Sequence, residues 1–346
     1  MRRFDYSSLS DRKWDNEIIN YLSQIHEYKG RQAYYIQNKS SELKRLVEVA
    51  KVQSTEASNS IEGIRTTETR LRQIMNERTT PRNRDEKEIA GYRDALNIIH
   101  ENFEYIPLTP NFILQLHKIV FQHTDSSFGG SFKDVQNYIS ATDESGSRFT
   151  LFTPLSPYET PTAIQEICDE YNRTIGEGKV DPLLIIPVFI HDFLCIHPFL
   201  DGNGRMSRLL TTLLLYRSGY EIGKYISLEA KIAKTKDAYY DALEISQDGW
   251  HEQKDDPTAF IKYLLGTIIA AYRDLDDRIR IVSPTSYETV KKAVDSKIGK
   301  FTKKDILGLC PSLSASTVER HLKKLTIEGY ISKYGAGKNT FYAKIE

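Results

Sequence analysis

The sequence predicts a mainly α-helical protein with two short strand-forming regions. Apolar residues recur at helical spacing through most of the 346-residue chain. Pro, Gly and polar clusters divide this pattern into segments of ordinary helix length. The apolar fraction is typical of a folded protein and aromatic residues are plentiful, so we expect packed cores rather than disorder. A chain of this length predicts two or three domains.

The N-terminal part is expected to be helical throughout. Leu43, Leu46 and Val47 illustrate the helical period of its first segment. Thr109 followed by Pro110 matches an N-cap residue with Pro at the first helical position, so a helix should begin there. The helices expected in this part cover residues 13–57, 67–75, 86–100 and 111–122.

Residues 135–153 break the helical pattern. β-Branched and aromatic residues flank the polar segment 143–147, which contains a Gly. This arrangement predicts a β-hairpin. Helical patterns then return, and the helices expected after the hairpin cover residues 161–174, 182–196, 205–216, 233–244 and 257–280.

The composition changes at Pro284. Residues 284–346 hold about twelve Lys and Arg against about six Asp and Glu, a net charge of roughly +6. Three helical patterns precede two short strand patterns that a Gly-rich turn connects, which predicts a C-terminal winged helix-turn-helix domain. The expected helices are 287–296, 303–309 and 314–328, and the expected strands are 330–333 and 340–343.

Composition also excludes several classes of protein. Cys168, Cys195 and Cys310 are far apart and odd in number, so neither a disulfide framework nor a thiolate metal site is indicated. No apolar run follows the basic N-terminus, which argues against a secretory signal. The most apolar stretch, residues 183–200, is interrupted by Pro, His and Asp and therefore predicts a buried helix rather than a membrane span. We expect a cytoplasmic protein.

Residues 196–208 carry the strongest functional signal, with the sequence Ile-His-Pro-Phe-Leu-Asp-Gly-Asn-Gly-Arg-Met-Ser-Arg. A buried helix should end at the His, and a new helix should begin at about Arg205. Backbone amides at a helix N-terminus, given freedom by Gly202 and Gly204, form an anion cradle. Arg205 and Arg208 are three residues apart and should share one face of the new helix, which favours a polyphosphate ligand.

Two further side chains complete this constellation. Asp201 supplies a hard oxygen ligand beside the phosphates, where Mg²⁺ can bind. His197 can accept a proton from an attacking hydroxyl because imidazole titrates near neutrality. The alternative is a structural turn in which the His caps a helix and both Arg are solvated. A structural turn, however, does not require Asp, Asn and two Arg in this register.

These residues resemble the HPFx(D/E)GN(G/K)RxxR signature of the Fic family. The similarity extends over about residues 109–265 and includes His191, Tyr239 and Tyr240. It implies a Fic-type helical core with a β-hairpin flap, ATP as a substrate and Mg²⁺ as a cofactor. One residue departs from the family pattern. Fic proteins often carry Gly-x-x-Arg just before the flap, and here Lys133 takes the place of the Arg.

The resemblance also implies a role for each motif residue. The base would be His197, and Asp201 would hold Mg²⁺ between the α and β phosphates. Arg205 and Arg208 would bind the outer phosphates. The hairpin would hold a target chain by strand addition, or it would simply close the fold. The anion hole would consist of the amides of Gly202, Asn203 and Gly204.

A second short pattern lies upstream. Residues 58–63 match the (S/T)xxxE(G/N) motif that Fic proteins resembling this one carry on an inhibitory helix, here near residues 54–63. A carboxylate at Glu62 would neutralise Arg208 and occupy the γ-phosphate position, and Ser58 would orient that carboxylate. The alternative is an ordinary helix end with Gly63 as its cap and Glu62 in solvent.

The sequence thus predicts an autoinhibited protein adenylyltransferase that moves AMP from ATP to Ser, Thr or Tyr hydroxyls of an unknown target protein. The expected domains are residues 1–105, 106–282 and 284–346. Three alternatives stay open. The protein could remove AMP from its target, it could transfer another phosphate-linked group, or it could be a DNA-binding regulator whose core senses a nucleotide. Lys333 and Lys338 could contact duplex DNA beside a recognition helix at 314–328; otherwise this domain would bind protein. A homodimer is the default assembly.

Overall fold

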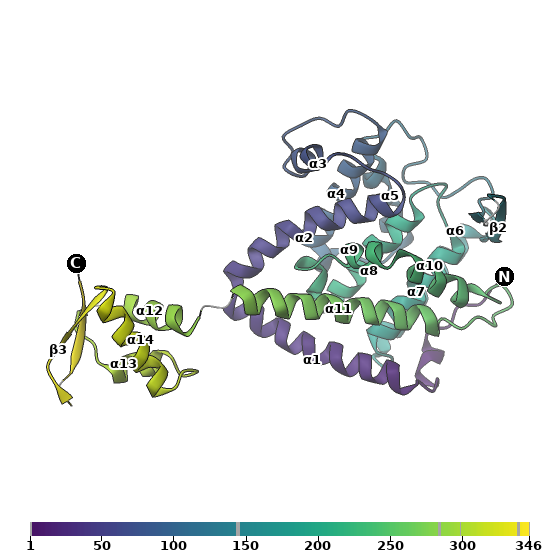
Figure 1. Ribbon diagram of the computed structural model, residues 1–346. Coiled ribbons are helices and arrows are strands. Elements are labelled where there is room, and N and C mark those ends of the chain that lie inside the picture. The colour runs from purple at the N-terminus through teal and green to yellow at the C-terminus, as the bar shows by residue number, and fades with distance from the viewer. Residues whose placement is uncertain (1, 143–145, 283–284, 298, 338–339, 346) are drawn as a thin grey trace. The chain divides into compact units, whose positions relative to one another are not determined.

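The computed structural model describes residues 2–142, 146–282, 285–297, 299–337 and 340–345. The chain divides into two compact units, Met1–Asp277 and Arg278–Glu346. The fold is mainly α-helical, as predicted (Figure 1). None of the helices in the described part of the chain is long and apolar enough to cross a membrane.

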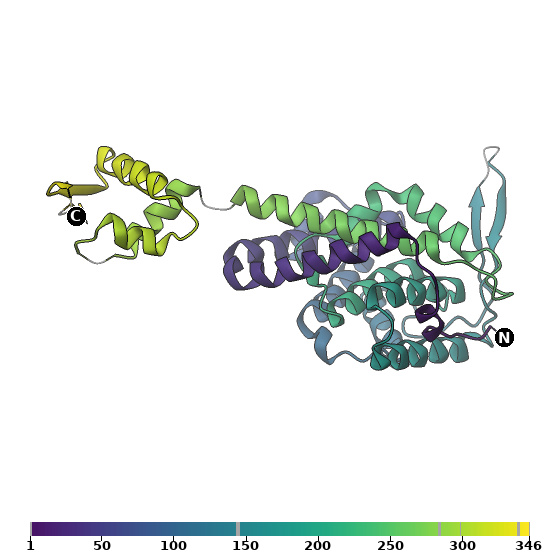
Figure 2. The ribbon, with the colours of Figure 1, turned by 90° about the horizontal axis from the view of Figure 1, so that it is seen from below.

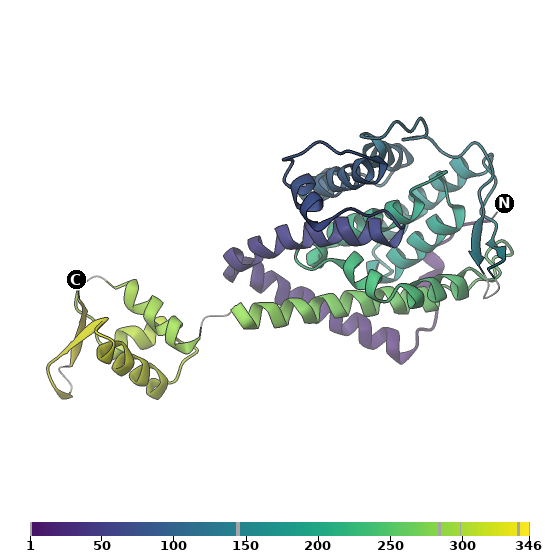
Figure 3. The same ribbon diagram turned by 45° about the horizontal axis from the view of Figure 1, so that its top comes forward.

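Two long helices begin the first unit. The sequence predicted one helical segment over residues 13–57, but the structure has α1 (Asn16–Asn38) and α2 (Ser40–Ile61). The break falls at Lys39, whose φ of −133° and ψ of 33° leave helical geometry. Asn38 has low helix propensity, which favours a helix end at this point. The spacing of apolar residues alone does not reveal such a break. Figure 3 shows α2 lying between the pair formed by α3 (Glu68–Met75) and α4 (Arg84–Asn102) on one side and α11 (Thr258–Val282) on the other.

Buried polar contacts fix α2 against its neighbours. The Ser54 hydroxyl donates to Glu229 Oε2 at 2.7 Å, and the Tyr92 hydroxyl donates to Glu229 Oε1 at 3.2 Å. All three residues are buried. Because an unpaired buried carboxylate is costly, these contacts set the position of α2 and hence of its C-terminal end. Tyr92 lies on α4 and Glu229 on α9 (Leu228–Lys234).

Helices α7 (Pro182–Ile196) and α8 (Asn203–Arg217) lie at the centre of the first unit. Every residue of α7 from Leu183 to Ile196 is buried, as expected of a helix that is apolar on all sides. Each large apolar side chain buried here contributes about 1.5–3 kcal/mol to folding. The loop between these two helices is therefore held by the most deeply buried part of the fold. The other helices of this unit are α5 (Pro110–Phe121), α6 (Thr160–Glu177), α10 (Lys236–Gln247) and α11 (Thr258–Val282).

The predicted hairpin is confirmed. Strands β1 (Ile139–Thr142) and β2 (Arg148–Phe152) pair antiparallel, with an irregularity between Ile139 and Ser140. Figure 2 shows the hairpin extending past the neighbouring helices. Most of its expected turn, residues 143–145, lies outside the described residues.

The second unit has its own small core. Helices α12 (Ser286–Asp295), α13 (Lys303–Leu309) and α14 (Ala315–Ile327) precede the antiparallel strands β3 (Ile331–Tyr334) and β4 (Phe341–Lys344). Their order is the predicted one. Residues from all three helices and both strands form one apolar cluster, including Val294, Ile306, Leu322, Ile331 and Tyr342.

Candidate active site

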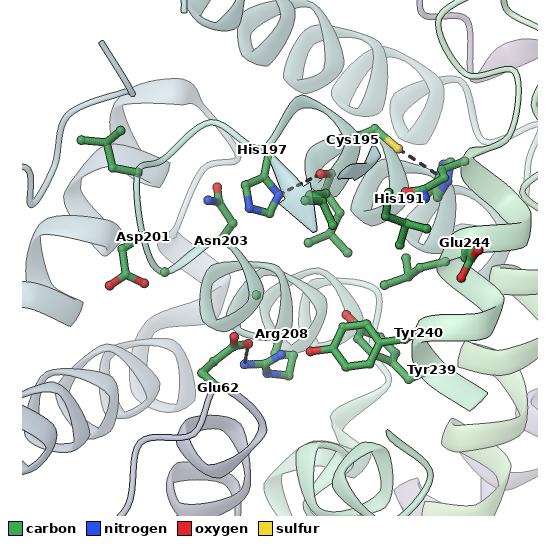
Figure 4. Close-up of a pocket in the computed structure, with 18 residues that line it drawn as sticks. Glu62, His191, Cys195, His197, Asp201, Asn203, Arg208, Tyr239, Tyr240 and Glu244 are labelled. Carbon is green, nitrogen blue, oxygen red and sulfur yellow. Dashed lines mark hydrogen bonds and ion pairs between the residues drawn. The ribbon is translucent and has the colours of Figure 1, made fainter. Parts of the chain in front are cut away.

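Seven of the nine residues predicted to form the site line one cavity of about 250 Å³ in the first unit (Figure 4), whereas Ser58 and Arg205 do not. The α7–α8 loop forms one wall, the end of α2 forms another, and α10 and the hairpin contribute the rest. The lining residues are Glu62, Ile139, Leu151, His191, Leu194, Cys195, His197, Leu200, Asp201, Gly202, Asn203, Gly204, Arg208, Tyr239, Tyr240, Leu243, Glu244 and Gln247.

Two left-handed residues shape the α7–α8 loop. His197 ends α7 with a φ of 51°, which is uncommon for a residue with a side chain. Gly202 begins α8 with a φ of 86°, where a Cβ would also lie 2.9 Å from the Phe121 ring. The α8 N-terminus therefore opens on the cavity two residues earlier than predicted, at Asn203.

The His197 ring is oriented as a general base requires. Its Nδ1 lies 3.1 Å from the Leu194 carbonyl oxygen. Because a carbonyl can only accept, Nδ1 carries the proton and Nε2 holds a free lone pair. Burial lowers the pKa of His197 to about 4, with Lys133 lowering it further and the Leu194 hydrogen bond and Glu62 opposing this. The imidazole is thus neutral at physiological pH.

Glu62 and Arg208 meet at the α8 N-terminus. Arg208 Nη2 donates to Glu62 Oε1 at 2.7 Å and to the Ser58 carbonyl oxygen at 2.9 Å. Glu62 is the C-cap of α2, and Gly63 follows with a φ of 82°. The residue pair that the sequence singled out is therefore in contact, although the helix also ends in the ordinary way. A Cβ on Gly204 would lie 2.2 Å from Glu62 Oε1, so this glycine leaves room for the carboxylate.

Ser58 has a different partner from the one predicted. Its hydroxyl accepts a hydrogen bond of 2.8 Å from Arg208 Nε, so it orients the guanidinium, whereas the sequence predicted that it orients the Glu62 carboxylate. Burial lowers the pKa of Arg208, but the facing Glu62 carboxylate, together with Tyr239 and Tyr92, outweighs this effect, so the pKa is raised.

The structure does not bring Arg205 and Arg208 together as the predicted pair of phosphate ligands. Arg205 is buried, does not line the cavity, and donates to Glu88 Oε2 at 2.5 Å and to Asp201 Oδ1 at 3.3 Å. Helical spacing places Arg205 and Arg208 near each other along α8, but Arg205 bonds to Glu88 on α4 and does not reach the cavity. Only Arg208 faces the cavity, so the two do not form a joint clamp in this structure.

Asp201 lies at the edge of the cavity with two cationic partners. Arg84 Nη2 donates to its Oδ2 at 3.0 Å, and Arg205 reaches its Oδ1. The described residues include no group of three His, Cys, Asp or Glu side chains able to hold a metal ion. A single carboxylate suits Mg²⁺ that arrives with a nucleotide, because phosphate oxygens and water then complete the shell. Asp201 fits that role once Arg84 moves away.

Asn203 uses its side chain to hold the loop. Its Oδ1 accepts from the Phe199 amide at 2.9 Å, and its Nδ2 donates to the Phe199 carbonyl at 2.7 Å. The backbone amides of Gly202, Asn203 and Gly204 are the groups at the α8 N-terminus that can meet an anion.

Sequence reasoning missed several residues around the site. Glu88 bonds to Arg205 and Arg84 bonds to Asp201, and Glu244 and Gln247 also line the cavity. The helical pattern over residues 233–244 predicted the approximate position of α10. It did not indicate that Glu244 or Gln247 would line a cavity. Their partners come from distant segments, which a local motif cannot reveal.

Comparison with known proteins identifies the domain that surrounds this cavity. Residues 107–215 match the Fic/DOC family. The chain is 27% identical over 270 residues to a protein named protein adenylyltransferase Fic from Drosophila willistoni, covering 75% of this chain and 50% of that protein. It is 26% identical over 184 residues to protein adenylyltransferase fic-1 from Caenorhabditis elegans, covering 52% of this chain and 32% of that protein. The chain thus spans half the length, or less, of these relatives.

Solved structures agree with this match at the level of fold. A Fic family protein from Desulfovibrio desulfuricans G20 superposes with a TM-score of 0.64 at 19% identity, covering 96% of this chain and 97% of that one. A Fic domain containing signaling protein from Bacteroides thetaiotaomicron VPI-5482 gives a TM-score of 0.60 at 24% identity, covering 77% and 97%. Residues 107–215 thus match a Fic domain, and the fold agrees with that of solved Fic proteins.

Proposed function

We propose that this protein transfers AMP from ATP to a Ser, Thr or Tyr hydroxyl of a target protein, and that Glu62 holds this activity low. The observation that carries the proposal is the free Nε2 of His197, which shares a cavity with the N-terminus of α8. A base beside an anion cradle supports in-line displacement at phosphorus.

The reaction can be followed atom by atom. The target hydroxyl gives its proton to His197 Nε2, and its oxygen forms a bond to the α phosphorus. The bond from that phosphorus to the bridging oxygen breaks, and pyrophosphate leaves. The amides at the α8 N-terminus and Arg208 would stabilise the phosphate charge. Asp201 would hold Mg²⁺, whose contribution is to neutralise phosphate charge.

The rest of the cavity fits a nucleoside. Leu194, Tyr240 and Leu243 offer apolar and aromatic surface beyond the phosphate cradle, which suits a stacked base. Glu244 and Gln247 add hydrogen-bonding groups at the same end. The β1–β2 hairpin borders the cavity through Ile139 and Leu151, and its edge can pair with an extended target segment.

The proposed inhibition by Glu62 is supported by its contact with Arg208. Its ion pair with Arg208 occupies the group that would bind the outer phosphates, and its carboxylate adds negative charge beside the cradle. ATP that binds in this state would be displaced from the orientation that attack requires. The names of the matched relatives support the proposal of adenylyl transfer. The proposed inhibitory role of Glu62 is supported by its ion pair with Arg208.

The test compares intact protein, Glu62→Gly and Glu62→Gly/His197→Ala in ATP labelled separately at the α and γ phosphates. We expect weak, strong and no transfer of the α label to protein, and no transfer of the γ label. Strong α labelling by the double variant would remove His197 from its role. Retained γ label would mean phosphorylation, and equal labelling by intact protein would end the inhibition proposal.

For the second unit we propose a winged helix-turn-helix that binds duplex DNA. Ser316, Arg320 and Lys323 are exposed along α14, and Lys333 is exposed on β3. The expected contact at Lys338 lies outside the described residues. We expect Arg320→Ala/Lys323→Ala to weaken salt-sensitive binding of a duplex, and Lys292→Ala on α12 to have little effect. Equal binding by both variants at two salt concentrations would exclude this face.

A further inference from the structure

The segment that leads into the hairpin makes an unusual set of contacts with the catalytic loop. Lys133 donates from its backbone amide to the Pro198 carbonyl at 2.8 Å and from Nζ to the Ile196 carbonyl at 3.0 Å. Asn137 Nδ2 donates to the His197 carbonyl at 3.1 Å and to the Phe199 carbonyl at 2.9 Å. Four consecutive carbonyls, from residues 196 to 199, are thus bonded by two residues.

These contacts bear directly on the backbone of His197. A residue with a side chain is strained in the left-handed region unless its surroundings stabilise that conformation. The last carbonyls of a helix also lack partners within the helix. Lys133 and Asn137 satisfy the carbonyls on both sides of His197, so they favour the conformation that aims its ring into the cavity.

The two side chains also hold each other. Lys133 Nζ donates to Asn137 Oδ1 at 2.9 Å, which leaves the Asn137 amide nitrogen to face the loop. Among the described residues, no carboxylate pairs with the Lys133 ammonium, although only 3% of this residue is exposed. Burying an ammonium without a counter-charge is costly, and a neutral residue would fill the space at lower cost.

We infer that Lys133 and Asn137 are positioning residues that hold His197 in its left-handed conformation and join the start of the hairpin to the base. This inference deepens the proposed function, on which it rests for the role of His197. Strand addition on β1, which begins two residues after Asn137, would then act on the same loop that carries the base. Lys133, which stands where the family pattern often has Arg, thus contacts the loop directly.

The experiment follows the His197 ring by ¹⁵N NMR in full-length protein labelled at histidine, with His197→Gln used to assign its signals. In the unmodified protein we expect a neutral ring with its proton on Nδ1. Asn137→Ala should shift the ring toward the Nε2 tautomer that free histidine prefers. Lys133→Met should raise the pKa of His197, because the Lys133 charge lowers this pKa. The Glu62 charge, which raises it, would remain.

Two matched variants make the result specific. Lys133→Arg keeps a cation and a donor and should preserve the tautomer. Lys29→Met removes a lysine that donates to the Ser218 carbonyl at 2.8 Å in the same unit but does not line the cavity. It should leave the His197 signals unchanged. If Lys133→Met does not fold, Asn137→Ala decides the matter, because that side chain is partly exposed. An unchanged His197 tautomer in Asn137→Ala would overturn the inference.

Kinetics provide a second readout in a Glu62→Gly background. A displacement of about 1 Å in a catalytic group can cost about 100-fold in rate. We expect kcat to fall by that order in Asn137→Ala while the KM for ATP changes less than about twofold, because the phosphate cradle is untouched. A rise in KM with unchanged kcat would contradict the positioning role. The NMR result stands even if no adenylyl transfer is detected, so the two proposals can fail separately.

Discussion

Arg208 donates to the Glu62 carboxylate and to the Ser58 carbonyl, so the C-terminal turn of α2 is bonded to the N-terminal turns of α8. The ion pair lies inside the proposed phosphate site rather than beside it. Inhibition and ATP binding would therefore compete for one guanidinium. The competing carboxylate belongs to the same chain and is present at a fixed, high effective concentration.

The first prediction isolates the charge of this carboxylate. Glu62→Gln should increase transfer of α-labelled AMP at least about tenfold, because an amide cannot neutralise Arg208 and leaves it free for phosphate. Glu56→Gln is the matched control, since Glu56 is exposed on the same helix. It should behave as the unmodified protein. Equal activation by both variants would point to a loosened α2 rather than to the ion pair.

The second prediction concerns the stability of the buried Arg205–Glu88 pair. Removing one partner of a buried ion pair costs about 3–5 kcal/mol, so Glu88→Ala should lower the free energy of unfolding by that order. Arg84→Ala should cost less than about 1 kcal/mol, because Arg84 is 69% exposed. Urea unfolding of the three proteins compares these values. A small effect of Glu88→Ala would mean that water replaces the lost carboxylate.

The grouping of His197, Asp201 and the glycines could be predicted from sequence because these residues lie within one short loop, so spacing alone brings them together. The contact of Glu62 with Arg208 spans 146 residues and was expected only from the resemblance to the Fic family. The roles of Arg205, Lys133 and Asn137 could not be predicted. Arg205 pairs with Glu88 across 117 residues and Lys133 reaches Ile196 across 63, and neither partner follows from helical period. The helices were predicted well where they are long and apolar, as in α7, and least well at the α1–α2 bend.

The third prediction is a loss of stability in acid. Burial lowers the pKa of His117, His191 and His197 to about 4 and that of His100 to about 3. Between these values and the ordinary 6.5, the unfolded chain binds more protons than the folded one, so stability falls as pH falls from about 6.5 to 4.

One buried carboxyl opposes this trend. Burial raises the pKa of Asp192 to about 6, so the folded state binds an extra proton between about 4 and 6. Four histidines should outweigh one carboxyl, and the urea midpoint should drop steadily from pH 7 to pH 4.5. A midpoint that stays constant over this range would contradict the burial of these rings.

The fourth prediction is the pH dependence of AMP transfer. A base must be neutral to accept a proton, so a pKa of about 4 for His197 implies nearly full activity at pH 5.5. An imidazole with the ordinary pKa of 6.5 would lose about tenfold there. The kcat/KM of Glu62→Gly between pH 5 and 9 distinguishes the two.

The last prediction concerns metal binding at Asp201, where Arg84 occupies Oδ2. A divalent ion must displace this guanidinium, and the displaced side chain keeps its second contact, to Glu88. Removing it should therefore strengthen binding of Mn²⁺ in the presence of a non-hydrolysable ATP analogue. Electron paramagnetic resonance of free Mn²⁺ should show a severalfold lower Kd for Arg84→Ala and little binding for Asp201→Asn. Arg82→Ala controls for the loss of one positive charge, because Arg82 is exposed and close in sequence. If Arg82→Ala strengthens binding as much as Arg84→Ala, general electrostatics would explain the gain, and the contact with Asp201 would have no specific role in metal binding.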